Sequence, residues 1–106
     1  TAKSNITFSS SMTPDSNLAN IFQTFASNAA AHAINVPTSA NIGQQITIRI
    51  SNVSGGVLGV ATWDAIYKMA AWTQPANGYS RSITFFYDDA TPAWIEISRT
   101  TVDIPN

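Results

Sequence analysis

Few residues in this chain have side chains that could do catalytic or metal-binding chemistry. His32 is the only histidine, so a metal site or a catalytic triad would have no second imidazole to use. Asp88 and Asp89 are adjacent and Asp64 could come near them, as an acid/base pair or a calcium site requires. Neighbouring carboxylates on a strand or tight turn point apart, however, which favours a solvated turn. With no cysteine and no phosphate-binding, nucleophile-elbow or zinc-protease motif, we expect no enzyme activity, no metal and no cofactor.

Length and charge place the chain among small single-domain proteins. Its 106 residues fit one domain, and five Lys and Arg against six Asp and Glu give a net charge of −1. The charged residues are scattered without a basic stripe, so we expect no nucleic-acid partner. No apolar run approaches the ~20 residues that span a bilayer, so we expect no membrane contact. A charged fraction of only 10% suits permanent contact with neighbouring proteins, and a secreted β domain with a Ser- and Thr-rich face fits equally well.

The elements that must position these residues are strands, and the clearest pair is a hairpin over residues 80–99. Successive side chains of a strand point to opposite sides, so each strand has two distinct faces. The predicted core face carries Ile83, Phe85, Ile95 and Ile97. Phe86 and Trp94 are predicted to face outward, and each therefore needs a partner. Residues 88–92 form the turn, because Asp tolerates tight-turn geometry and Pro92 presets its own φ.

Two further strands precede the hairpin. Residues 44–51 alternate strictly, which predicts a strand whose three isoleucines point inward. Residues 57–63 are rich in β-branched side chains, and Gly59 among them marks a bulge or a close backbone approach. Turn signals recur every ten or so residues. We therefore expect an all-β fold, an antiparallel β-sandwich or jelly roll.

The N-terminal third of the chain has weaker signals. Residues 1–16 are polar and predict an extended N-terminal arm, ordered by a neighbouring subunit, that precedes a single β-sandwich domain over residues 17–106. In residues 13–35 the apolar side chains have helical spacing, so local signals slightly favour an amphipathic helix over two strands. The chain begins at Thr1 without methionine, as trimming of an initiator before a small residue would leave it. On that ground we expect the 106 residues to be the whole product.

The aromatic side chains have two functional interpretations besides core packing. Exposed aromatic rings on a β domain stack on sugar rings, or they anchor protein interfaces, where Trp and Tyr are enriched. For any one ring we rank the core first, an interface second and sugar binding third. The candidates for glycan stacking are Trp72, Tyr79 and Trp94.

A family resemblance extends from about Leu18 to the end of the chain. It is carried, in order, by LANIFQTFASN, INVPTSANIGQQITIRISN, SGGVLGVATWDAIYK, WTQPANGYSRSITFFYD and AWIEISRTTVDIPN. These segments resemble small β domains of tailed-bacteriophage virion proteins, which occur as terminal domains of tail fibres or as short stand-alone structural proteins. The resemblance implies two strands where local signals favour a helix, and it supplies no catalytic residues.

Two segments depart from the pattern of that family. The turn DDATPAW is lengthened and stiffened by Pro92, and the alanine run around His32 replaces a more polar turn. We interpret both segments as contact loops. The candidate interface residues are Phe86, Trp94, Asp88, Asp89, Pro92, His32, Ile6 and Phe8.

The resemblance implies a structural role in a virion that assembles in the bacterial host cytoplasm. We expect a capsid decoration (cement) protein that forms a homotrimer and contacts the major capsid protein or other virion proteins. The alternatives are a receptor-binding module of a tail fibre, which would bind a host glycan, and a tail or neck adaptor.

Overall fold

The computed structural model describes residues 2–106, and that range contains strands and loops but no helix. The strands are β1 (Lys3–Asn5), β2 (Ser11–Met12), β3 (Ile21–Ala26), β4 (His32–Ile34), β5 (Gln45–Asn52), β6 (Ala61–Trp63), β7 (Tyr67–Lys68), β8 (Tyr79–Asp88), β9 (Ala93–Arg99) and β10 (Ile104–Pro105). They form a seven-stranded sheet in the order β1-β3-β5-β8-β9-β7, with β10 alongside β8, and a three-stranded sheet in the order β2-β4-β6. The all-β class is confirmed, as are β3 and β4 where local signals favoured a helix.

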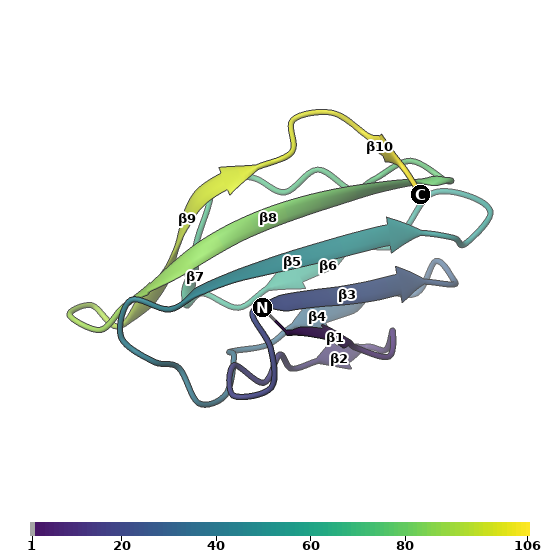
Figure 1. The fold of residues 1–106 in the computed structure, drawn as a ribbon. Coiled ribbons are helices and arrows are strands. Elements are labelled where there is room, and N and C mark those ends of the chain that lie inside the picture. The colour runs from purple at the N-terminus through teal and green to yellow at the C-terminus, as the bar shows by residue number, and fades with distance from the viewer. Residues whose placement is uncertain (1) are drawn as a thin grey trace.

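The N-terminal half of the chain winds back and forth between the two sheets (Figure 1). β1, β3 and β5 run parallel in the large sheet, and β2, β4 and β6 run parallel in the small sheet. Each successive pair of strands is therefore one coil of a solenoid-like arrangement, with one strand in each layer. This differs from the expected antiparallel sandwich or jelly roll, because the spacing of turns does not report whether a chain returns directly or by way of another sheet.

The C-terminal half adds antiparallel strands to the large sheet. β8 pairs antiparallel with β5 and β9, and β7 pairs parallel with the outer edge of β9. β10 pairs with the first two residues of β8, where Ile104 lies opposite Ser80. The turn between β8 and β9 extends beyond the rest of the large sheet (Figure 1). This turn, the hairpin tip, is therefore an exposed end of the molecule.

The core lies between the two layers. Ile46, Ile48 and Ile50 of β5 are buried, and so are Ile83 and Phe85 of β8. These five side chains occupy alternate positions of two adjacent strands, so they share the inner face of the large sheet. The inner faces predicted for β5 and β8 are confirmed.

The inner face of β9 is the opposite of the predicted one. Trp94 is 0% exposed and its ring packs against Tyr87, with the ring centroids 5.0 Å apart, whereas Ile97 is 47% exposed. Strand pairing places Tyr87 opposite Trp94 and Phe86 opposite Ile95, so Trp94 shares the inner face with Tyr87. Both faces of β9 carry apolar residues, and burying the tryptophan removes the larger apolar area from water. The predictions that Trp94 faces outward and that Ile95 and Ile97 face inward were wrong, since Ile95 lies opposite Phe86 on the outer face.

The N-terminal segment is part of the fold and does not extend from it as an arm. β1 and β2 are the outermost strands of the two sheets, paired with β3 and β4 of the same chain. Met12 and Pro14 are buried, so the segment also contributes to the core. Strands of two or three residues are too short to show an alternating pattern, which is why the segment resembles an arm in sequence.

Gly59 lies where the chain passes close to the loop between β3 and β4. A Cβ atom at Gly59 would be 2.3 Å from the carbonyl oxygen of Ala29 and 2.8 Å from the carbonyl carbon of Ala30. The close backbone approach predicted at this glycine is confirmed. The surrounding strand is shorter than predicted, since β6 covers only Ala61–Trp63.

Candidate functional site

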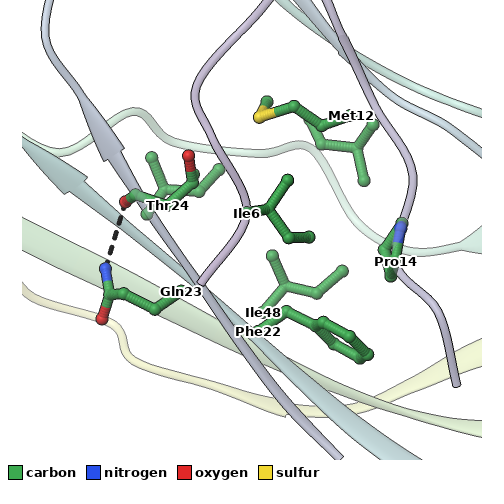
Figure 2. Close-up of a pocket in the computed structure, with 9 residues that line it drawn as sticks. Ile6, Met12, Pro14, Phe22, Gln23, Thr24 and Ile48 are labelled. Carbon is green, nitrogen blue, oxygen red and sulfur yellow. Dashed lines mark hydrogen bonds between the residues drawn. The ribbon is translucent and has the colours of Figure 1, made fainter. Parts of the chain in front are cut away.

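One cavity lies inside the core, between the N-terminal segment and strands β3, β4 and β5 (Figure 2). Its volume is about 10 Å³, and its walls are mostly apolar. The lining residues are Ile6, Met12, Pro14, Phe22, Gln23, Thr24, Ile34, Ile48 and Ile50. A cavity of this size has room for about one water molecule. It is a gap in the packing and offers no site for a substrate or cofactor.

Thr24 lines this cavity, and its buried hydroxyl has no hydrogen-bond partner among residues 2–106 (Figure 2). Thr24→Val replaces the hydroxyl with a methyl group of similar shape and removes the cost of burying an unpaired polar atom. We expect the free energy of unfolding to rise by about 1 kcal/mol, as measured by urea denaturation. Thr62→Val, at an exposed position of β6, is the control and should change it by less than about 0.5 kcal/mol. A loss of stability in Thr24→Val would contradict the absence of a partner.

Three of the predicted interface residues lie at the hairpin tip. Asp88 Oδ1 accepts a hydrogen bond from the backbone N–H of Ala90 at 3.0 Å, which closes the turn. Asp89 and Pro92 are exposed, and Asp89 accepts no hydrogen bond from any residue in the described range. The two carboxylates therefore have different surroundings and do not form an acid/base pair.

His32, another predicted interface residue, is buried in the core. Its ring lies 4.9 Å from the ring of Phe8. Nδ1 is 3.1 Å from the carbonyl oxygen of Ala30 and Nε2 is 3.4 Å from the amide nitrogen of Gln74, so the tautomer that satisfies both donates from Nδ1 and accepts at Nε2. Gln74 in turn accepts a hydrogen bond from the indole N–H of Trp72 at 3.0 Å. His32 is thus part of a buried hydrogen-bond chain and is not available as a surface contact.

The remaining interface candidates fall into two places. Ile6 and Phe8 are half-buried against the core, and both line a shallow groove of about 330 Å³. The ring of Phe8 lies beside that of His32. Phe86 lies on the outer face of the large sheet, opposite Ile95, where it is half-buried. The structure therefore brings Phe8 together with His32 and with Ile6, and leaves the hairpin tip as a separate surface.

The three residues predicted to stack on sugars do not form one platform. Trp94 is completely buried, and Trp72 is half-buried with its ring centroid 5.1 Å from that of Trp63. Only Tyr79 is exposed, and it lies opposite Pro105 where β8 begins. The predicted glycan-stacking surface is therefore reduced to a single exposed ring.

Tyr67 has a hydroxyl that is fixed as a hydrogen-bond donor. The hydroxyl donates to the carbonyl oxygen of Asn35 at 2.8 Å. Burial, assisted by the negative charge of Asp64, raises the pKa of Tyr67 far above its ordinary value. The phenol therefore stays protonated, and it joins β7 to the loop after β4 without offering a base or a nucleophile.

Glu96 and Arg99 of β9 hold the segment after β7 against the large sheet. Arg99 Nε and Nη2 donate to the Glu96 carboxylate at 2.6 and 2.8 Å. The same guanidinium donates to the carbonyl oxygens of Ala71 at 2.7 Å and Ala70 at 2.9 Å, and the N–H of Ala70 donates back to Glu96 at 3.0 Å. The hydrogen bonds from Arg99 hold the pKa of Glu96 below its ordinary value, although partial burial opposes them.

Glu96→Gln is expected to lower the free energy of unfolding by about 1 kcal/mol at pH 7, because it removes charge-assisted hydrogen bonds. The pKa of Glu96 is lower in the folded than in the unfolded state, so its contribution is complete above the unfolded-state pKa and is lost as the pH falls through the folded-state pKa. The wild type and the variant should therefore converge in stability between pH 7 and about pH 3, measured by urea denaturation. Asp15→Asn, at a carboxylate without an ion pair in residues 2–106, is the control. A difference that stays constant with pH would contradict the role of the charge.

Arg49 is a polar residue of the outer sheet face that the sequence interpretation did not single out. Its Nη1 donates to Gln23 Oε1 at 2.9 Å and its Nε donates to Ser80 Oγ at 3.1 Å. Gln23 and Ser80 are each only 1% exposed, so they hold the guanidinium in a fixed position. These three residues come from β3, β5 and β8, and only the single charge in the alternating segment QITIRISN marks the site in the sequence.

Residues 2–106 bring together no group of three His, Cys, Asp or Glu side chains that could hold a metal ion. The same range contains no helix with the length and apolar character needed to span a membrane. Comparisons with protein-family models, with curated proteins and with solved structures found no match to this chain.

Proposed function

We propose that this chain is a structural protein of a tailed-bacteriophage virion that decorates the capsid as a homotrimer. The proposal starts from the resemblance of the segments between Leu18 and the C-terminus to small virion β domains. Its mechanism is passive: the protein clamps neighbouring capsid subunits through apolar and neutral polar contacts. Each contact is weak, but an interface of about 1,600 Å² repeated over a shell adds up to a large stabilisation.

The observation that carries the proposal is a pair of highly exposed apolar side chains at each end of the molecule. Leu18 and Ile42 are 65% and 78% exposed, and they lie in loops that precede β3 and β5. Val57 and Val60 are 86% and 72% exposed and lie beyond the far end of β5, in the loop before β6. We interpret these exposed apolar side chains as parts of contact surfaces. Apolar contacts at two opposite ends suit a protein that bridges adjacent subunits.

The scarcity of charge points the same way. Four of the eleven charged residues are bound to each other within the chain, in the ion pairs Arg81–Asp103 and Arg99–Glu96. The central regions of protein interfaces are depleted in charged residues, because each unpaired charge must be desolvated on binding. A partner protein can therefore cover a surface with so few free charges at a small desolvation cost.

A cryo-electron microscopy map of virions that contain this protein tests the proposal. Density that fits the ten-stranded fold at the quasi-threefold positions of the capsid, in groups of three, is the expected result. Density confined to the tail would contradict the decoration of the capsid.

A tail-fibre module is the second candidate, because the solenoid-like coils end in two strands whose outer edges have no partner within residues 2–106. Within residues 2–106, β1 and β2 are edge strands of parallel sheets, and further coils can add to such edges, as they do along a fibre. Binding of the isolated protein to a glycan array, lost in Tyr79→Ala, would support this candidate. Absence of binding to the glycan array, together with density on the capsid, would reject the tail-fibre candidate.

A further inference from the structure

We propose that Arg49 receives the Asp89 carboxylate at the hairpin tip of a second copy of this chain. The inference rests on the homotrimer of the proposed function and identifies a contact that holds it together. Three features support this contact: the charges that the fold leaves unmatched, the fixed position of Arg49, and the distance between the two residues within one chain.

Arg49 is the one arginine of residues 2–106 without a carboxylate partner. Arg81 pairs with Asp103 at 2.8 Å, and Arg99 pairs with Glu96 at 2.6 Å. Arg49 donates only to a neutral amide and a neutral hydroxyl, and its Nη2 donates to no acceptor within the described residues. An arginine with free donors on a sheet face is suited to bind an external carboxylate. Its planar guanidinium can donate two parallel hydrogen bonds to the two carboxylate oxygens.

The guanidinium of Arg49 is held in place before any partner arrives. The amide nitrogen of Gln23 donates to Ser51 Oγ at 3.0 Å and to the carbonyl oxygen of Thr24 at 3.1 Å, which directs the amide oxygen toward Arg49. Ser80 fixes the other side of the guanidinium through Nε. A side chain that is already ordered loses little conformational entropy on binding, so more of the interaction energy appears as affinity.

The surface around Arg49 is neutral and partly apolar. Thr47 and Thr84 lie across from each other on the same face, with their hydroxyls 2.8 Å apart. Ile21 and Phe25, the exposed apolar residues of β3, flank this part of the sheet. No acidic residue pairs with these positions in the strand register to repel an incoming carboxylate. Apolar neighbours limit the access of water, which strengthens an ion pair between two chains.

Asp89 is the matching unsatisfied group. Every other side-chain carboxylate in the described range accepts a hydrogen bond from a backbone N–H or from an arginine: Asp15, Asp64, Asp88, Glu96 and Asp103. Asp89 accepts none and is exposed at the hairpin tip, which projects from the end of the large sheet (Figure 1). A projecting acidic loop is the complement of a flat face with one fixed cation.

The two residues cannot meet within one chain. Arg49 lies opposite Ser82 of β8, and Asp88 at the end of that strand is six positions further along. At roughly 3.3 Å per residue, the tip is about 20 Å from Arg49. The contact therefore requires a second copy, and it joins two different surfaces. A contact of that kind forms a ring or an open filament, and a ring of three is the closed form that agrees with a homotrimer.

The test is the mass of the full chain in solution, measured by light scattering after size exclusion and by sedimentation equilibrium. The wild type is expected to be a trimer, and Arg49→Glu and Asp89→Arg should each weaken it by about tenfold or more in dissociation constant. The double variant Arg49→Glu/Asp89→Arg restores opposite charges and should restore the trimer. Lys68→Glu changes the charge at an exposed cation on β7 and is the control that should leave the trimer intact.

Several results would overturn the contact. A wild-type monomer at high protein concentration, trimers that persist in both single variants, or a double variant that stays dissociated would each do so. Loss of binding to a uronic-acid polysaccharide in Arg49→Glu, with the trimer unaffected, would reassign Arg49 to a glycan site. Asp89→Arg keeps the test meaningful if Arg49→Glu fails to fold, because Asp89 is exposed and its side chain accepts no hydrogen bond within residues 2–106. Failure of the contact leaves the capsid role open, since virion density tests that separately.

Discussion

Trp94→Ala is expected to lower the free energy of unfolding by about 3–5 kcal/mol, the range for deleting a completely buried aromatic ring. The ring packs against Tyr87, and Tyr67 of β7 lies opposite Trp94 in the register, so its loss opens a cavity between three strands. For a chain of this size the transition temperature should fall by roughly 15 °C or more. Thermal unfolding followed by circular dichroism measures the change.

Two variants of β9 serve as controls for this prediction. Trp94→Phe keeps an aromatic ring and removes an indole N–H that has no partner among residues 2–106, so it should cost much less than Trp94→Ala. Ile97→Ala removes a half-exposed side chain of the same strand and should cost less than about 1 kcal/mol. If Ile97→Ala destabilised the fold as strongly as Trp94→Ala, the core would contain the face that alternation alone predicts.

Gly59→Ala is expected to lower the free energy of unfolding by about 3 kcal/mol. The added Cβ would lie 2.3 Å from the carbonyl oxygen of Ala29 and 2.8 Å from the carbonyl carbon of Ala30. Both are backbone atoms, so neither can move away by a side-chain rotation. The loop between β3 and β4 would have to move. That movement would also disturb the hydrogen bond that Gln74 donates to the carbonyl oxygen of Gly59 at 2.8 Å, and with it the chain of contacts to His32.

Gly56→Ala is the matched control for Gly59→Ala. A Cβ at Gly56 has open space within 4 Å, and φ is not positive there. The substitution should change the free energy of unfolding by less than about 0.5 kcal/mol, or raise it slightly by restricting the unfolded chain. Urea denaturation followed by tryptophan fluorescence compares the two variants. Equal effects would show that the loop around Ala29 gives way without cost.

Parts of this fold can be predicted from the sequence because their patterns are long and one-sided. In β5 the three isoleucines alternate with polar residues, so both the strand and its inner face follow from the pattern. β9 carries apolar residues on both faces, and only its pairing with β8 decides that Trp94 is buried. The parallel pairing of β1, β3 and β5 cannot be predicted from the local sequence, because periodicity identifies a strand but not its direction.

The candidate site is harder to predict, since it depends on contacts distant in sequence. Arg49 is 26 residues from Gln23 and 31 residues from Ser80, and neither neighbour belongs to a recognisable motif. The hairpin tip could be predicted as an exposed turn because Asp and Pro determine its local geometry. His32 could not be placed, because its burial depends on Phe8 and Gln74, from two other parts of the chain.

The interleaving of the two sheets also constrains how the chain folds. β2 pairs with β4 only after the intervening β3 has crossed to the opposite layer, and the same holds for β4, β5 and β6. We therefore expect the chain to fold coil by coil, with one strand of each coil joining each layer. Nearly all of these pairings join distant segments, which makes loop closure the slow step. We therefore expect the chain to fold slowly for its size, because of its topology as well as its contact energies.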